Sequence, residues 1–448
     1  MVCEGATVKS GVRVWPQKNI EEGATMTRDC LWSDCAPPIF KGSAVEGKRY
    51  ELTGERLARI GRAIACVVGE WGSVAVASDG TSAGHMSKLA VTAGILEGGC
   101  DALDMGRTVL PAVRSGAKAL NCGGAVYAAR DGDSIVLRLM DGKGNDAGRS
   151  SVQDVEIAYW EGCGACRGDR IGAFIPAAEI TALYRMDLLQ RVNAHRLRAT
   201  GGFVALTGGG MEEELLKLLF SLCGYSTASA PDGEAAAVLA RRRKGTAMAV
   251  KGESLSVFVP SGELTGSELY ALFAEMDVLC GEKELFADVT AGPGLEKIAE
   301  RSGARLYRLP RRELKKALSD RDTLTAELLR DPFGAALMLC ARLSERGMTA
   351  EDLYATLPRS CKSERSVPVS ARDIGRIFRL IAQDSGGMAD MTEGIRIVRR
   401  GGWVNLLPDA TARHMRIIAQ SFSEEYSESL ADIYAKKVEK ILKEREKG

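Results

Sequence analysis

Short apolar runs and helix-spaced apolar positions alternate along most of the chain. Ser73–Ser78 reads Ser-Val-Ala-Val-Ala-Ser, a run typical of a buried strand. Four residues before it recur at helical spacing, namely Leu57, Ile60, Ile64 and Val67. A second helix is expected over Ser82–Glu97. Such alternation predicts a mostly parallel sheet that is covered by helices.

The alternation returns twice further along the chain. Phe203–Leu206 enters a glycine turn and the predicted helix Glu212–Leu222, and Leu285–Val289 leads into the predicted helix Gly294–Ser302. The three units are longer than solenoid repeats, which makes them domains. The last segment carries a helix, two strands and a long charged helix. The predicted fold class is therefore α/β, with three related mixed α/β domains and a smaller C-terminal α+β domain.

The composition is that of an ordinary soluble globular protein, with 448 residues of which 45% are hydrophobic and 27% charged. Lys plus Arg (60) nearly balances Asp plus Glu (59), which leaves no electrostatic footprint for nucleic acid or an anionic membrane. The default partner is thus a small molecule or a protein. No apolar run of about 18 residues and no signal-peptide pattern appear, so a cytoplasmic location is expected.

Twelve cysteines are scattered through the chain, mostly one at a time in apolar segments. In a reducing compartment they should remain mostly thiols. The chain has two close pairs, Cys30 with Cys35 and Cys163 with Cys166. Together the two pairs would supply the four thiolates of a zinc site. Only the second pair has the common two-residue spacing. Free thiols are the favoured interpretation, and zinc is the alternative.

Gly123–Leu139 predicts an apolar strand, a polar turn over Arg130–Ser134 and a second strand. With its neighbours this stretch resembles the catalytic loop of the α-D-phosphohexomutases, which reads Thr-Ala-Ser-His-Asn-Pro and whose serine carries the phosphoryl group. Ala129 stands at the serine position and Arg130 at the histidine position. An alanine has no hydroxyl to phosphorylate. Ser134 is a candidate displaced nucleophile, although a turn or strand-start residue is the favoured interpretation.

The resemblance implies the phosphohexomutase architecture, in which three α/β domains and a smaller fourth domain surround a central cleft and each contributes one loop. On this chain it implies an N-terminal extension and then domains I to IV, at residues 1–38, 39–155, 156–275, 276–365 and 366–448. In the first loop, Phe40–Gly47 lines up with the family motif Phe-Gly-Thr-Ser-Gly-Ile-Arg-Gly. Glu46 replaces the arginine that faces the phosphoryl group in the family.

The loop that holds magnesium in the family resembles Asp-Gly-Asp-Ala-Asp-Arg. Its three ligand positions are Lys251, Glu253 and Leu255 in this chain. Magnesium demands hard oxygen ligands, so one carboxylate beside an ammonium group makes a poor site. No cofactor is therefore predicted, and magnesium is expected only if the protein is an active enzyme of the family.

The two remaining family loops bind the sugar and the distal phosphate. At the sugar loop, Glu327 is the candidate acid, without the serine, glycine and histidine that follow it in the family. Trp403–Ile417 fits the frame of the phosphate loop, but Asp409 replaces its serine. The phosphate-binding candidates that remain are Thr411, Arg413 and Arg416.

The loss of key residues from all four loops predicts a phosphohexomutase-like protein without mutase turnover, which acts by binding a sugar phosphate or a protein partner, or by regulation. The alternative is a divergent hexose-phosphate mutase, or another sugar-phosphate enzyme, with a shifted, metal-free site. A zinc-linked structural protein is the third hypothesis. Two positions carry a charge opposite to that of the family, since Glu46 replaces an arginine and Lys251 replaces a magnesium-binding carboxylate. These opposite charges indicate that Glu46 pairs with Arg130 or Lys251. The alternative of equal weight is that each side chain is solvated.

Overall fold

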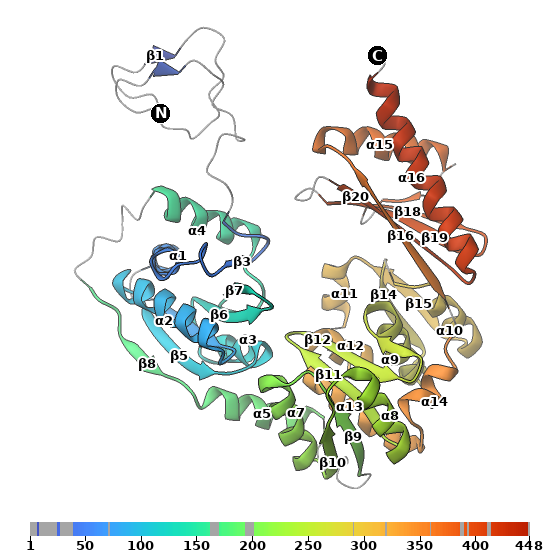
Figure 1. Cartoon of the computed structure of the whole chain (residues 1–448), viewed down its shortest axis with the longest axis horizontal. Helices are drawn as coiled ribbons and strands as arrows, with labels where there is room; N and C mark the ends of the chain where they lie inside the picture. The colour runs from blue at the N-terminus through green and yellow to red at the C-terminus, as the bar shows by residue number, and fades with distance from the viewer. Residues whose placement is uncertain are drawn as a thin grey trace. The chain divides into compact units, whose positions relative to one another are not determined.

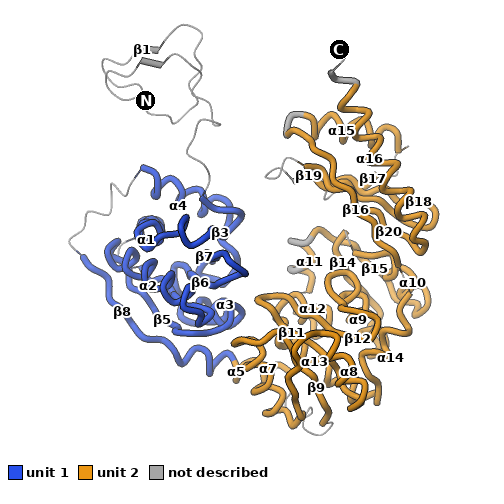
Figure 2. Tube along the Cα trace, in the orientation of Figure 1, with its two compact units in different colours: residues 1–184 blue, residues 185–448 orange. Residues whose placement is uncertain are grey.

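The computed structural model describes residues 7–8, 25–26, 39–69, 72–161, 170–192, 201–289, 291–318, 320–358, 360–385, 389–391, 394–409 and 414–446. The chain divides into two compact units, residues 1–184 (unit 1) and residues 185–448 (unit 2), which Figure 2 distinguishes by colour. Within the described ranges, no helix has the length and apolar character needed to cross a bilayer.

A six-stranded sheet forms the centre of unit 1, in the order β3-β7-β6-β4-β5-β8 (Figure 1). Its strands are β3 (Ala44–Lys48), β4 (Ser73–Ser78), β5 (Asp101–Arg107), β6 (Gly124–Asp131), β7 (Ser134–Asp141) and β8 (Phe174–Pro176). Strands β6, β4, β5 and β8 are parallel, as the alternation predicts. Strand β7 is antiparallel to both β6 and β3 because a tight turn joins β6 to β7 and leaves no room for a crossover helix.

Helices cover both faces of this sheet. They are α1 (Gly54–Val68), α2 (Ser82–Glu97), α3 (Leu110–Ala119), α4 (Arg149–Glu161) and α5 (Ile180–Arg191). Helices α1, α2 and α4 share one apolar cluster with the sheet, and α3 shares another. Two glycines let α1 and α2 approach closely: a Cβ at Gly61 would lie 2.1 Å from the carbonyl oxygen of Val91, and one at Gly94 would lie 1.8 Å from that of Ala58.

Unit 2 contains three sheets, in the orders β10-β9-β11-β12-β13, β14-β15 and β16-β20-β19-β18-β17. Their strands are β9 (Gly202–Leu206), β10 (Tyr225–Ser229), β11 (Thr246–Lys251), β12 (Ser254–Val259), β13 (Gly262–Leu264), β14 (Glu284–Asp288), β15 (Arg305–Leu309), β16 (Cys361–Pro368), β17 (Ala389–Asp390), β18 (Ile395–Arg399), β19 (Gly402–Asp409) and β20 (His414–Ser421). The third, antiparallel sheet buries one apolar face against α15 and α16.

The helices of unit 2 are α7 (Gly210–Leu222), α8 (Gly233–Arg243), α9 (Gly266–Leu279), α10 (Gly294–Ser302), α11 (Arg311–Ala317), α12 (Leu324–Arg330), α13 (Pro332–Arg346), α14 (Ala350–Ala355), α15 (Ala371–Asp384) and α16 (Glu424–Glu446). In unit 1, two further short strands, β1 (Thr7–Val8) and β2 (Thr25–Met26), pair with each other.

The predicted α/β class with an α+β unit at the C-terminus is confirmed. The boundaries of the four domains stay a prediction.

Several local expectations can be compared directly with the structure. Strand β4 and helix α2 have the predicted bounds. The turn between β6 and β7 is shorter than predicted, because β6 continues to Asp131 and β7 already begins at Ser134. Cys66 is disulfide-bonded, contrary to the expectation of a thiol at that position. The four cysteines of the candidate zinc site, Cys30, Cys35, Cys163 and Cys166, lie outside the described residues.

Candidate functional site

The β6–β7 hairpin turns on two residues, Gly132 and Asp133, between the strand partners Asp131 and Ser134. Gly132 has a φ of +58°, which a glycine adopts without strain. Glycine at the first turn position is typical of the two-residue turns that match the twist of the strands. Ser134 is therefore the first residue of β7, as the favoured interpretation predicts.

Ala129 and Arg130 lie on opposite faces of the sheet because successive residues of a strand alternate. Ala129 packs against the apolar cluster on the α3 side. Arg130 lines a pocket on the side of α1 and α2. The predicted serine position and the predicted histidine position are thus separated by the sheet itself.

The carboxylate of Asp79 fixes the hairpin to the loop between β4 and α2. Its Oδ2 accepts a hydrogen bond from the backbone N–H of Arg130 at 2.8 Å. Its Oδ1 accepts from the backbone N–H of Thr81 at 2.9 Å and from the Thr81 hydroxyl at 2.8 Å. A Cβ at Gly84 would lie 2.2 Å from Oδ1, so the first turn of α2 needs a glycine there.

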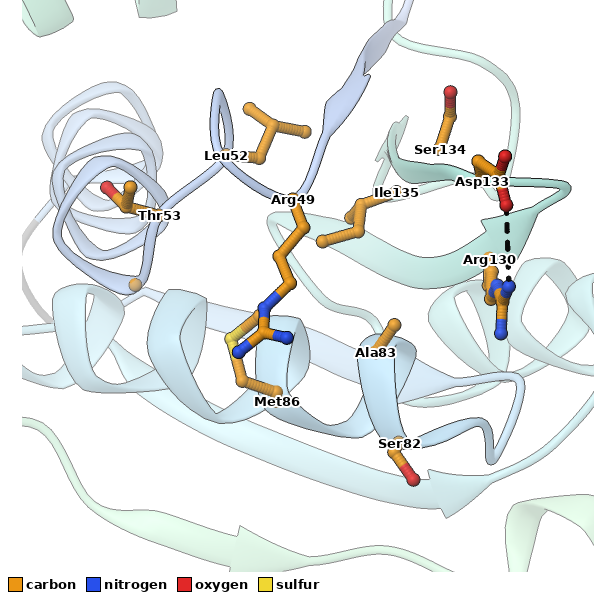
Figure 3. Close-up of a pocket in the computed structure, with 11 residues that line it drawn as sticks. Arg49, Leu52, Thr53, Ser82, Ala83, Met86, Arg130, Asp133, Ser134 and Ile135 are labelled. Atoms are coloured by element: carbon orange, nitrogen blue, oxygen red, sulfur yellow. Dashed lines mark ion pairs between the residues drawn. The ribbon is translucent and has the colours of Figure 1, made fainter.

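The pocket beside this hairpin has a volume of about 760 Å³ (Figure 3). Its walls combine two arginines, three hydroxyl side chains and one carboxylate with a larger apolar surface, from Arg49, Leu52, Thr53, Gly54, Ser82, Ala83, Met86, Arg130, Asp133, Ser134 and Ile135. The pocket lies entirely within unit 1. We call it the arginine pocket.

The first residues of two helices line the arginine pocket. Helix α1 begins at Gly54 after the N-cap Thr53, and α2 begins at Ser82 after the N-cap Thr81. The first N–H groups of a helix have no partner within the helix, and the helix dipole places positive potential there. Two helix N-termini beside two guanidinium groups favour an anion.

The two arginines of the pocket differ in how they are held. Arg130 Nε donates to the carbonyl oxygen of Gly132 at 2.7 Å, and its guanidinium lies 3.7 Å from Asp133. Arg49 forms neither a hydrogen bond nor an ion pair with any residue that the structure describes, and Figure 3 shows its guanidinium beside Met86. Arg49 is thus the cation most available to a ligand.

The sequence interpretation missed Arg49 and Ser82 as site residues. The threonines at the two N-caps, Thr53 and Thr81, could have indicated this site. Each marks the start of a helix, and both helices start at the same end of the sheet. No periodicity identifies Arg49, which lies between the end of β3 and the N-cap Thr53.

The expected ion pair between Glu46 and Arg130 is not formed. Glu46 lies opposite Val136 in the pairing of β3 with β7, and its ion-pair partner is Lys41 at 4.0 Å. The Arg130 guanidinium instead turns back onto its own hairpin. No ion pair between Glu46 and Arg130 therefore closes this pocket.

The predicted magnesium positions form the tight β11–β12 hairpin. Lys251 and Ser254 are strand partners, so Glu253 lies in the turn. Leu255 is 3% exposed and belongs to the interior of the sheet. A buried leucine cannot replace a carboxylate ligand, so these residues do not fit magnesium. Within the described parts of the chain, no group of His, Cys, Asp or Glu residues has the arrangement of a metal site.

Glu327, the candidate acid of the sugar loop, is 2% exposed within α12. Its Oε1 accepts a hydrogen bond from Arg191 at 2.7 Å, and Arg191 also lies 3.2 Å from Asp331. Burial raises the pKa of Glu327, and the charges of Arg191 and Arg330 oppose that effect. Glu327 therefore joins α12 to Arg191, within unit 2, and is not presented to solvent.

Of the phosphate-loop candidates, Arg416 lies on β20, and its guanidinium donates to Glu364 on β16 at 2.7 Å. This contact is the main reason that the pKa of Glu364 is below its usual value. Thr411 and Arg413 lie outside the described residues. The fourth loop therefore stays a prediction.

Known proteins resemble this chain in sequence and in fold. The family model for phosphoglucomutase/phosphomannomutase, alpha/beta/alpha domain I, matches residues 38–129. The chain is 24% identical over 441 residues to the phosphoglucomutase/phosphomannomutase of Thermococcus kodakarensis, across 88% of this chain and 96% of that protein. It is 22% identical over 453 residues to the phosphopentomutase of the same organism, across 91% and 99% of the two chains.

A solved structure agrees with these relatives. The phosphoglucomutase/phosphomannomutase family protein of Burkholderia thailandensis matches with a TM-score of 0.71 at 15% identity, over 90% of this chain and 97% of that one. Residues 38–129 thus match domain I of the family, and nearly the whole chain is similar in sequence and fold to members of the α-D-phosphohexomutase family, as its motifs predict. Within domain I the family match ends at residue 129, directly before Arg130.

Proposed function

We propose that the protein is a divergent sugar-phosphate enzyme of the phosphohexomutase family, with a shifted, metal-free site in the arginine pocket. The observation that carries this proposal is the meeting of two guanidinium groups and two helix N-termini in one pocket of about 760 Å³. This volume is in the range of small-molecule sites. The names of the full-length relatives, a phosphoglucomutase/phosphomannomutase and a phosphopentomutase, support a sugar phosphate as ligand.

In this proposal the phosphate binds between Arg49 and Arg130, because guanidinium groups bind phosphate oxygens in pairs of parallel hydrogen bonds. Ser82 and Ser134 also line the pocket, and their hydroxyls suit the hydroxyls of a sugar. Phosphoryl transfer depends chiefly on positioning and on stabilising charge at the transferred group. The pocket supplies the cationic charge. In place of a serine at residue 129, the hydroxyls of Thr53, Ser82 and Ser134 are its groups that can accept a phosphoryl group, with the hydroxyl proton passing to the sugar oxygen that leaves.

The second candidate is a binding or regulatory protein without mutase turnover. A specific observation favours it: the methyl group of Ala129 packs into an apolar cluster, where the family has its phosphorylated serine. The residues at the magnesium positions also favour this candidate, because Leu255 is buried at a position where the family has a carboxylate. A protein partner, and not only a sugar phosphate, then becomes a possible ligand.

A turnover assay with three substrates separates the two candidates. Glucose 1-phosphate, mannose 1-phosphate and ribose 1-phosphate are each incubated with the protein, with and without the matching bisphosphate and magnesium. Conversion of one substrate, lost in Arg49→Gln, supports the enzyme. Binding without conversion supports the second candidate. Neither binding nor conversion of any of the three would overturn the enzyme and leave a protein partner as the ligand of the second candidate.

A further inference from the structure

Four polar side chains are buried together on the face of the C-terminal sheet that points away from α15 and α16. They are Arg396, Trp403, Asn405 and Gln420, which we call the polar patch, and they are 6%, 2%, 0% and 4% exposed. Arg396 is the strand partner of Asn405, and Trp403 is the strand partner of Gln420. The patch therefore spans the three adjacent strands β18, β19 and β20.

All four of these side chains carry atoms without a hydrogen-bond partner. The unpartnered atoms are Arg396 Nε, Trp403 Nε1, both side-chain amide atoms of Asn405, and Gln420 Oε1. Nearly all buried polar groups in proteins are hydrogen-bonded, so each exception needs an explanation. The described residues contain seven such atoms in all, and five of them lie on this one patch.

The patch also holds a cation whose charge is only partly balanced. The Arg396 guanidinium lies 5.0 Å from the Trp403 ring and 3.8 Å from Glu296, a carboxylate already held by Arg308 at 2.7 Å. Burial and then the charge of Arg308 lower the pKa of Arg396 to about 10, although Glu296, Asp390 and Asp288 oppose this.

The loop that precedes α10 approaches the patch at Gln420, and Glu296 of α10 approaches it at Arg396. A Cβ at Gly292 would lie 3.2 Å from Gln420 Oε1. Small residues surround that point, since the next nearest atoms are the hydroxyls of Ser267 and Ser360, at 3.5 and 3.8 Å. The surroundings of Gln420 are thus polar at this point, and Arg308 donates to the carbonyl oxygen of Gly292 at 3.2 Å.

We propose that the polar patch binds one small inorganic anion between the C-terminal sheet and α10. Arg396 Nε, Trp403 Nε1 and the amide nitrogen of Asn405 donate hydrogen bonds to it. The oxygen and nitrogen of an amide exchange places by a simple rotation, so Gln420 adds a fourth donor. Bound there, the anion neutralises Arg396 and joins β18, β19 and β20 to the helix above them. This site is independent of the arginine pocket.

Thermal unfolding in phosphate, sulfate and chloride, against gluconate at matched ionic strength, tests the proposal. At least one of the three anions should raise the unfolding temperature by about 2 to 4 °C. The arginine pocket is itself proposed to bind phosphate, so the comparison is made in the Arg49→Gln background. The shift should persist in Arg49→Gln and disappear in the double variant Arg49→Gln/Asn405→Leu, and a shift of equal size in these two proteins would overturn the proposal.

Two further measurements do not depend on whether Asn405→Leu folds. The stabilising anion should change the tryptophan emission of the wild type more than that of Trp403→Phe, because Trp403 donates to the anion. A crystal soaked in bromide should show anomalous density within hydrogen-bonding distance of Arg396 Nε and Asn405. Equal emission changes in the two proteins, or water alone in the patch, would contradict anion binding there.

Discussion

The Asp79 carboxylate accepts a hydrogen bond from the backbone N–H of Arg130 at 2.8 Å, across 51 residues of sequence. The same carboxylate accepts two hydrogen bonds from Thr81 at the start of α2. Asp79 therefore sets the position of the hairpin relative to a helix N-terminus. The geometry of the arginine pocket depends on this one side chain.

Asp79→Ala should destabilise the protein by about 2 to 4 kcal/mol, because three donors lose a charged acceptor. It should also weaken sugar-phosphate binding, since Arg130 and the start of α2 are no longer held together. Chemical denaturation followed by circular dichroism measures the first effect. Asp133→Ala is the matched control, because Asp133 is 95% exposed in the turn and should leave stability nearly unchanged. Equal stability of the two variants would contradict the role of Asp79.

Arg191→Met should destabilise unit 2 by about 1 to 3 kcal/mol, because the buried carboxylates of Glu327 and Asp331 both lose an ion pair, although Glu327 keeps Arg330. The control is Arg62→Met, which removes an ion pair of the same 2.7 Å length from the surface, where such pairs contribute less than about 1 kcal/mol. Denaturation midpoints of the two variants measure the difference. Equal destabilisation would contradict a structural role for Glu327.

Asp277 on α9 should make stability depend on pH. Burial raises the pKa of Asp277 from 3.8 to about 6, although N–H groups of Leu324 and Thr325 donate to its carboxylate. Between these values the folded protein binds more protons than the unfolded chain, so this contribution to stability is complete below pH 3.8 and is lost as pH rises through 6.

The loss amounts to about 2 to 3 kcal/mol over that interval, because one pKa unit corresponds to about 1.4 kcal/mol. Urea denaturation of the wild type and of Asp277→Asn at a series of pH values measures it. The variant should lack this fall in stability. Parallel pH profiles for the two proteins would show that Asp277 has an ordinary pKa.

Magnesium should neither stabilise the protein nor bind at the β11–β12 hairpin. Leu255→Asp, which restores one family ligand, should destabilise the protein by about 3 kcal/mol because it places a carboxylate at a 3% exposed position. Ser254→Asp, one residue away on the exposed side, serves as control. Calorimetric titration with magnesium should give no binding heat in any of the three proteins. Saturable heat that disappears in Glu253→Ala would contradict this.

Local pattern was enough to predict strands such as β4 and helices such as α2, because their apolar spacing is set by the face they bury. Strand alternation also separates Ala129 from Arg130, a consequence that follows from sequence once β6 is placed. The partners of Glu327 and Asp79 did not follow from pattern. Arg191 is 136 residues from Glu327, and Arg130 is 51 residues from Asp79, so only the folded chain brings them together.

The most direct test of the arginine pocket is calorimetric titration of glucose 1-phosphate into the wild type, the double variant Arg49→Gln/Arg130→Gln, and the control Arg62→Gln. Each charged hydrogen bond to phosphate contributes about 1.5 to 3 kcal/mol, so the double variant should bind at least about tenfold more weakly. The control should bind like the wild type. An unchanged affinity in the double variant would contradict the assignment of this pocket as the sugar-phosphate site.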